Sequence, residues 1–266
     1  MKPASQRRVW VKRDERRQAI MDLLVATRAV DLDDLAVRFA VSRMTIHRDL
    51  DDLEQAGLLR KVRGGATIEA GTQFESDFRI RALQDSEAKI RMAHAARALI
   101  EPGMTVMVND GSMAALLGAS LTECAPLSVI TNNAAVIERL KDAPRVTLIA
   151  LGGIYSVKFN GFFGMVTEDA LSRLRADLAF ISTPAVAGLR AFHMDDGVVR
   201  TKRAMMQASE RCALLVNHAR FGRSALHALA DLSDFDAIIT DAPPAPEDRA
   251  AIDRAGIALT IAKDPA

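Results

Sequence analysis

The sequence has few of the features that mark secreted, membrane or metal-binding proteins. It contains only two cysteines, Cys124 and Cys212, which form no Cys-x-x-Cys pair, so we expect two small apolar side chains and neither a disulfide nor a metal site. No apolar run approaches the roughly 18 residues of a membrane-spanning helix. The basic N-terminus has no apolar core of the kind that a secretory signal needs. These absences predict a cytoplasmic protein that contacts no membrane.

What is present is an ordinary globular composition with an uneven distribution of charge. Hydrophobic residues make up 49% and charged residues 26% of the 266 residues, which is enough chain for two domains. Residues 1–65 contain 14 basic and 10 acidic residues, whereas the remainder contains 21 basic and 24 acidic residues. The basic excess at the N-terminal end favours a DNA-facing module joined to a neutral or acidic domain.

Residues 13–66 have the periodicity of a helix-turn-helix followed by a short hairpin. Residues 13–26 place apolar side chains on one stripe with charges opposite. Asp31 can cap a second helix and Ser42 a third. The apolar face of the third helix consists of Ile46, Leu50 and Leu53. Two short helices joined by a tight turn predict a helix-turn-helix, and the alternative is a small helical domain with a solvated basic face.

Polar side chains of the third helix are predicted to contact DNA. The N-terminal turns of such a helix enter the major groove, where arginine, histidine and threonine can contact bases or phosphates. The predicted DNA-binding residues of this helix are Ser42, Arg43, Thr45, His47 and Arg48. The hairpin that follows predicts a wing, which places over phosphates the side chains of Arg60, Lys61 and Arg63. DNA would repel the acidic residues of the helix, so we expect them to point away: Asp49, Asp51, Asp52 and Glu54.

From Asp85 onward, short apolar runs alternate with helical stretches. The predicted strands are Thr105–Val108, Ser128–Thr131, Val146–Ala150, Leu178–Ser182, Ala213–Val216, Ala237–Thr240 and Ile257–Ile261. The predicted helices lie at about 112–122, 133–141, 166–176, 202–210, 224–230 and 246–255. Because continuous apolar strands are buried on both faces, this pattern predicts a doubly wound, mostly parallel α/β sheet. The predicted domains are a winged helix-turn-helix at 1–66, a linker at 67–84 and an α/β effector-sensing and oligomerisation domain at 85–266.

The N-terminal segment resembles the signature of the DeoR family of bacterial transcription regulators. The matching residues are Arg17, Ile20, Leu24, Leu35, Phe39, Ser42, Thr45, Ile46, Arg48, Asp49, Leu50, Leu53, Gly57 and Leu58, together with the run from Arg60 through Gly64-Gly65-Ala66. His47 departs from the pattern, because the family usually has a second arginine there. The resemblance implies a DNA-binding regulator, more often a repressor, of a carbohydrate or polyol operon. It also implies that residues of about 80–262 have a ribose-phosphate-isomerase-like fold and bind a small, phosphorylated sugar effector.

Glycine and polar residues follow successive strands of the predicted sheet. Ligands of parallel sheets bind at the carboxyl ends of the strands, often against a helix N-terminus. The predicted effector-binding residues are Asp110, Gly111, Ser112, Thr131, Asn132, Gly152, Gly153, Lys202, Asn217 and Arg220. Each motif alone is more common as a simple turn, and only the family resemblance favours Lys202. Met113 and Asn217 stand where the family commonly has threonine and aspartate, so the predicted effector is an unusual sugar or polyol phosphate or lacks the phosphate.

Two enzymatic alternatives are open at this point. Asp110 and Lys202 could serve as the base and the cation that an active sugar-phosphate isomerase needs. The resemblance to the DeoR family instead implies a domain that binds its ligand without turnover. Dinucleotide binding is disfavoured, because no Gly-x-Gly-x-x-Gly opens a helix after the first strand. We therefore predict no catalytic residue, no cofactor and no metal. A single helix-turn-helix reads only a half-site, so the predicted partners are double-stranded operator DNA, the effector and further copies in a homo-oligomer.

Overall fold

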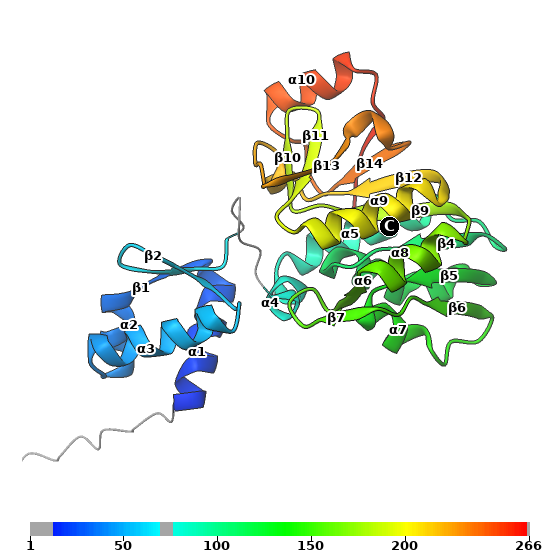
Figure 1. Ribbon diagram of the computed structural model, residues 1–266. Helices are drawn as coiled ribbons and strands as arrows, with labels where there is room; N and C mark the ends of the chain where they lie inside the picture. Colours follow the sequence, from blue (N-terminus) through cyan, green and yellow to red (C-terminus); the bar gives the residue numbers. More distant parts are fainter. Residues whose placement is uncertain (1–12, 70–76, 265–266) are drawn as a thin grey trace, which may run out of the picture. The chain divides into compact units, whose positions relative to one another are not determined.

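The structure is a computed structural model that describes residues 13–69 and 77–264. The chain divides into two compact units, Met1–Glu69 and Ala70–Ala266, which Figure 1 colours blue to cyan and cyan to red. Among the described residues, no helix is both long and apolar enough to span a bilayer. Both cysteines are free thiols; Cys212 is buried and Cys124 is half-buried. Burial raises the pKa of the Cys212 thiol to about 11.

The N-terminal unit is a winged helix-turn-helix, as the sequence predicts. Its helices are α1 (Arg13–Thr27), α2 (Leu32–Phe39) and α3 (Arg43–Gln55). Its strands are β1 (Ala29–Asp31), β2 (Arg60–Val62) and β3 (Gly65–Thr67), in the antiparallel order β1-β3-β2. Strand β1 is only three residues long and is not predicted from the sequence. The glycine at position 65 allows β1 to pair with β3, because a Cβ at that position would lie 2.0 Å from the Val30 carbonyl oxygen.

The core of this unit is built from the helical stripes that the sequence predicts. Ile20, Leu24, Ile46 and Leu50 are fully buried. Asp31 caps α2 by accepting hydrogen bonds from the backbone amides of residues 33 and 34. The apolar stripe therefore fixes which side of each helix faces outward.

The C-terminal unit contains, within residues 77–264, a seven-stranded parallel sheet (Figure 1). Its strands are β4 (Thr105–Val108), β5 (Leu127–Thr131), β6 (Val146–Ala150), β9 (Ala176–Ser182), β12 (Ser209–Leu215), β14 (Ala237–Thr240) and β15 (Leu259–Ile261). Their order is β15-β14-β12-β9-β4-β5-β6. The chain adds β5 and β6 on one side of β4 and then adds β9, β12, β14 and β15 on the other side, as in doubly wound folds. All seven predicted strands are confirmed, with shifted ends at several of them.

Helices cover both faces of this sheet. The helices are α5 (Ser86–Arg97), α6 (Ser112–Ser120), α7 (Ala134–Leu140), α8 (Met165–Ser172), α9 (Asp196–Gln207) and α10 (Pro246–Arg254). Side chains of α5, α6 and α7 pack with Val106 and Val108 on one face. Side chains of α8, α9 and α10 pack with Met107 on the other. The alternation along β4 explains why its whole run is apolar, since both faces are buried.

The remaining elements correct several predictions. Residues 227–231 form strand β13 (His227–Asp231), not the predicted helix, because they pair with β11 (Arg190–His193), which also pairs with β10 (Ala185–Ala187). The predicted linker contains helix α4 (Phe78–Leu83), whose Phe78 and Ile80 are buried. Helix α9 begins at Asp196, capped by Asp195, so Lys202 lies in its middle and not at its start. Also unpredicted are β7 (Ile154–Ser156), β8 (Gly161–Phe163) and the 3-10 turns η1 (Leu121–Cys124), η2 (His218–Arg220) and η3 (Leu232–Asp234).

Candidate functional site

Helix α3 presents a polar, partly basic face away from its buried stripe. Ser42 caps the helix: its hydroxyl accepts from the Thr45 amide at 3.2 Å and lies 2.9 Å from the Thr45 hydroxyl. Arg43 is exposed and forms an ion pair of 2.9 Å with Asp33. His47 is half-buried and Arg48 is exposed. The five predicted residues therefore lie in the first two turns, where Ser42 and Thr45 also start the helix.

The acidic residues of α3 are turned toward neighbouring elements, as predicted. Asp49 is 2% exposed and accepts from the Arg16 guanidinium at 2.5 and 3.2 Å. Asp52 pairs with Arg13 and Arg17 of α1. These contacts neutralise carboxylates that would otherwise repel a polyanion, and they join α3 to α1.

The wing differs from the prediction at one residue. Arg60 and Arg63 are exposed, which leaves both guanidinium groups available to phosphates. Lys61 instead pairs with Asp51 of α3, and its backbone amide donates to the Glu54 carboxylate at 2.7 Å. The hydrogen bond from the Lys61 ammonium to the Asp51 carboxylate lowers the pKa of Asp51. Lys61 therefore fastens the wing to α3.

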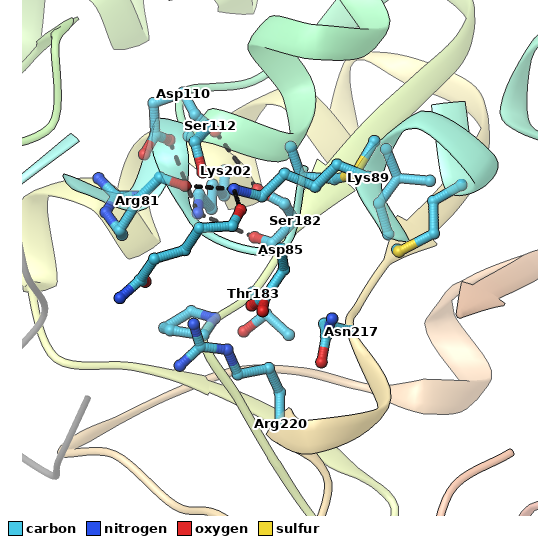
Figure 2. Close-up of a pocket in the computed structure, with 16 residues that line it drawn as sticks. Arg81, Asp85, Lys89, Asp110, Ser112, Ser182, Thr183, Lys202, Asn217 and Arg220 are labelled. Atoms are coloured by element: carbon cyan, nitrogen blue, oxygen red, sulfur yellow. Dashed lines mark hydrogen bonds and ion pairs between the residues drawn. The ribbon is translucent and has the colours of Figure 1, made fainter. Parts of the chain in front are cut away.

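A pocket of about 630 Å³, open mouth included, lies at the carboxyl ends of β4, β9 and β12 in the C-terminal unit. Six of the ten predicted effector residues line it: Asp110, Gly111, Ser112, Lys202, Asn217 and Arg220. Helices α4 and α5 and the turn between them supply further walls: Gln84 lines the pocket, and Figure 2 shows Arg81, Asp85 and Lys89.

The turn after β4 brings a helix N-terminus to the pocket. Gly111 has φ +110° and precedes Ser112, the first residue of α6. A Cβ at Gly111 would lie 2.9 Å from the Ser182 hydroxyl, in addition to the strain of a positive φ. The amides of this first turn carry the positive end of the helix dipole and favour an anion.

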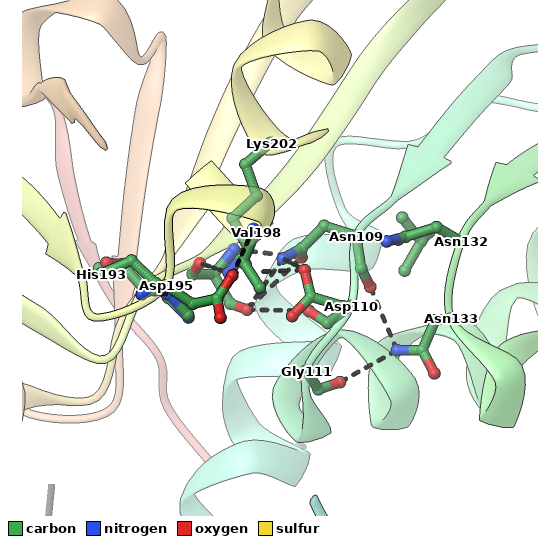
Figure 3. Close-up of polar contacts among 12 residues, drawn as sticks. Asn109, Asp110, Gly111, Asn132, Asn133, His193, Asp195, Val198 and Lys202 are labelled. Atoms are coloured by element: carbon green, nitrogen blue, oxygen red, sulfur yellow. Dashed lines mark hydrogen bonds and ion pairs between the residues drawn. The ribbon is translucent and has the colours of Figure 1, made fainter. Parts of the chain in front are cut away.

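Lys202 is a buried cation on the floor of the pocket. Its side chain is 2% exposed, and its Nζ donates to the Ser182 carbonyl at 2.9 Å and lies 3.6 Å from Asp110 Oδ1. The Asn109 side-chain oxygen accepts from the Ser182 amide at 3.2 Å, which ties the ends of β4 and β9 together. The Asn133 side-chain amide donates to the carbonyls of Asn109 and Gly111, both at 3.1 Å (Figure 3). These bonds hold the charged groups in fixed positions.

Lys89 is the second lysine of the pocket, and it is half-buried. Its Nζ donates to the backbone carbonyls of Arg81 and Gln84, the latter at 2.6 Å. Burial lowers the pKa of Lys89 from 10.5 to about 8, with Asp85 opposing the shift and Arg81 and Arg220 adding to it. Its ammonium is thus in equilibrium with the neutral amine near physiological pH.

The charge of the pocket favours an anion. Among the described residues that line it, four are basic, Arg81, Lys89, Lys202 and Arg220, and two are acidic, Asp85 and Asp110. Hydroxyl and amide groups stand beside them on Ser112, Thr183 and Asn217 (Figure 2). Cations with neighbouring hydrogen-bonding groups are what a phosphorylated polyhydroxy compound requires.

The other four predicted effector residues do not line this pocket. The Thr131 hydroxyl donates to the Val108 carbonyl at 2.6 Å, and the Asn132 amide donates to the Phe162 carbonyl at 2.9 Å. Gly152 and Gly153 are exposed, and the Gly152 carbonyl accepts from the Thr167 hydroxyl at 2.6 Å. These residues shape the turns after β5 and β6. The sheet places the β5 and β6 ends beyond β4, at the edge away from β9 and β12.

The walls that α4 and α5 provide are not predicted from the sequence. Arg81 and Gln84 fall in the segment that was predicted to be a linker, and Asp85 and Lys89 follow it directly. Asp77 is the one local signal that points to α4, because it caps the helix through the backbone amide of residue 79 at 2.9 Å. An Asp followed by alternating apolar and basic residues was too short a pattern to identify the helix.

Comparison with known families matches both units. The model of the DeoR-like helix-turn-helix domain matches residues 16–71. The model of the DeoR C-terminal sensor domain matches residues 84–242, more than half of the chain. The second match begins at Gln84, so it includes α5 and the turn after β4.

Individual relatives are transcription regulators. The chain is 29% identical to the glycerol-3-phosphate regulon repressor of Escherichia coli over 235 residues, which cover 88% of this chain and 93% of the relative. It is 32% identical to the L-fucose operon activator of Haemophilus influenzae over 209 residues, or 78% and 84% of the two chains. Ribose 5-phosphate isomerase A of Methanocaldococcus jannaschii matches with a TM-score of 0.39 and 16% identity, covering 52% of this chain and 55% of the enzyme.

Proposed function

This chain belongs to the DeoR family of DNA-binding transcription regulators, and from that premise we propose that it represses a carbohydrate or polyol operon until a phosphorylated sugar or polyol occupies the pocket. The observation that carries the proposal is the convergence of four cations on one cavity of the sensor domain. The names of its relatives favour this effector class, since they refer to a glycerol phosphate regulon and a fucose operon.

The DNA contacts in this proposal come from the first two turns of α3 and from the wing. Arg43, His47 and Arg48 face the major groove, while Arg60 and Arg63 lie over phosphates. The ion pairs that turn the acids of α3 toward α1 and the wing support this docking. One helix-turn-helix reads a half-site, so the functional form is at least a dimer.

The subunits are joined in this proposal through an exposed apolar surface and not through the apolar faces of the helices. The apolar faces of the helices pack on the sheet and are not available to a second subunit. Exposed apolar side chains gather instead between β7 and the start of α8: Ile154, Tyr155, Val157, Met165 and Val166. Met165→Glu is expected to shift the mass of the full chain in multi-angle light scattering to that of a monomer, whereas an unchanged mass would move the interface elsewhere.

The sensor domain binds its effector without turnover in this proposal. A sugar-phosphate isomerase needs a carboxylate that is able to take a proton from the substrate. Asp110 is instead held beside Lys202, whose ammonium also donates to the Ser182 carbonyl. Incubation of the full chain with pentose and hexose phosphates is expected to give no aldose–ketose conversion, and substrate-dependent turnover would contradict this part of the proposal.

The test is a titration of the repressor–DNA complex with candidate effectors. Duplexes selected by the full chain from a randomised pool are labelled, and their fluorescence anisotropy is followed with glycerol 3-phosphate, pentose 5-phosphates, hexose 6-phosphates and their unphosphorylated parents. We expect one phosphorylated compound to weaken DNA binding by about 5- to 150-fold, the usual range of allosteric coupling, and its parent to have no effect. Arg220→Ala should abolish this response, and Arg223→Ala, which lies outside the pocket, should retain it. No response to any phosphorylated compound would contradict the proposal.

A further inference from the structure

The outward centre of α3 is occupied by an apolar side chain. Successive residues of a helix are about 100° apart, and Ile46, Leu50 and Leu53 mark the buried side of α3. Two positions in the first two turns of the helix lie opposite that stripe, Met44 and Arg48, and Met44 is the apolar one. Its side chain is 62% exposed.

The neighbours of Met44 place it within the predicted DNA-reading face. His47 and Arg48 lie one turn further along the same face, because residues three and four apart are adjacent on a helix. The Ser42 hydroxyl and the Thr45 amide and hydroxyl are engaged in the helix cap. Arg43 is paired with Asp33 toward α2. Met44 is therefore the residue of the first turn that projects most directly away from the body of the domain.

We infer that Met44 selects a thymine in each half-site by contact with its 5-methyl group. The inference rests on the proposed docking of α3 in the major groove. Thymine carries the apolar group on the major-groove edges of the base pairs. A thioether has no hydrogen-bond donor and only a weak acceptor, so it offers little to guanine, adenine or cytosine edges. Its flexible, polarizable chain is well suited to pack against a methyl group.

A solitary exposed apolar residue requires no explanation in general. Val37 of α2, which is 82% exposed, is such a residue in the same domain. Met44 differs from it by its position, because groups at the centre of the reading face lose their water when the helix enters the groove. A thioether desolvated there against a polar base edge would leave that edge without its hydrogen bonds, which costs affinity. The structure therefore favours T·A over the other base pairs at the position that Met44 faces.

The experiment removes single methyl groups from the DNA. Duplexes selected by the full wild-type chain are prepared with each thymine in turn replaced by deoxyuridine, which lacks only the 5-methyl group. Competition binding is then measured for the wild type, Met44→Ala and the control Val37→Ala. We expect one thymine per half-site at which deoxyuridine weakens wild-type binding roughly fourfold, which corresponds to about 0.8 kcal/mol for one buried methyl group.

The variants distinguish the contact from a general effect of the methyl group on DNA shape. At that thymine, Met44→Ala should bind the two duplexes equally, and Val37→Ala should keep the fourfold difference. The inference is overturned when no methyl-sensitive thymine exists in the selected site, or when the sensitivity persists in Met44→Ala. Failure of the proposed function is recognised separately, since the wild type would then select no duplex at all.

Discussion

Lys89 provides a prediction about pH that follows from its position in the pocket. Its lowered pKa of about 8 reflects burial in a site that holds Arg81 and Arg220, with Asp85 as the opposing charge. An anionic effector prefers the ammonium form and therefore raises this pKa on binding. Above pH 8 the amine is neutral in the empty pocket, so binding must be accompanied by proton uptake and becomes weaker as the pH rises.

The magnitude follows from the fraction of protonated Lys89. With a pKa of about 8, that fraction falls roughly tenfold between pH 7 and pH 9, and so does the affinity if only the ammonium form binds. A phosphate monoester does not add to this change, because its second ionisation, near pH 6, is nearly complete at pH 7. Titration calorimetry of the effector that the anisotropy assay identifies, in buffers of different ionisation enthalpy, gives both the affinity and the protons taken up.

A matched variant separates Lys89 from the other groups of the pocket. Lys89→Met keeps the length of the side chain and removes its charge, so it is expected to bind more weakly at pH 7 and with little dependence on pH. Arg91→Met, on the same helix but outside the pocket lining, should behave as the wild type. An affinity of the wild type that is constant between pH 7 and pH 9 would refute the reasoning.

Three further predictions concern the two units separately. Asp49→Ala deprives the buried Arg16 guanidinium of its carboxylate and should destabilise the N-terminal unit by about 3–5 kcal/mol. Amide hydrogen exchange of the full chain measures this loss, and exchange in α1 and α3 at the wild-type rate would contradict the prediction. Arg48→Ala should weaken operator binding by about 1–3 kcal/mol without changing effector affinity, and an unaltered operator affinity would show that Arg48 faces away from the DNA. Asn217→Asp adds a negative charge to the pocket and should weaken binding of the phosphorylated effector by on the order of 1 kcal/mol, more at low salt than at high salt; equal affinity at low salt would place the phosphate far from Asn217.

The sequence predicted the elements whose pattern is long or repeated. The stripe of Ile46, Leu50 and Leu53 and the cap at Ser42 identified α3, and seven apolar runs identified the parallel sheet. The pocket residues at the ends of β4 and β12, Asp110 and Asn217, followed from the rule that ligands bind at the carboxyl ends of strands. The predictions of α3 and of the sheet hold because burial on a helix stripe or on both faces of a sheet leaves a periodic signal.

What was missed depends on contacts between segments far apart in the chain. Residues 224–230 have no local feature that distinguishes a helix from a strand, and the pairing of residues 227–231 with β11 decides the outcome. Helix α4 is short, and it is stabilised by burial of Phe78 and by the Lys89 ammonium at its C-terminal carbonyls. The order of the strands decides which turns meet: β9 and β12 lie beside β4, so the turns after β5 and β6 lie outside the pocket.

Two of the three departures from the family's usual residues, Met113 and Asn217, lie in the pocket lining, where they have different consequences. Met113 stands where the family commonly has a threonine, so the start of α6 offers one hydroxyl, that of Ser112, and an apolar side chain beside it. Asn217 caps η2 through the amide of residue 219 at 2.9 Å, and an aspartate would cap it equally well. Capping therefore does not explain why residue 217 is an asparagine, whereas the charge of the pocket does. Because residue 217 carries no carboxylate, Asp85 and Asp110 are the only acidic groups among the described lining residues that oppose the four cations. An amide at this position lowers the cost of bringing a doubly charged phosphate close to Arg220, and it still donates to a sugar or polyol oxygen.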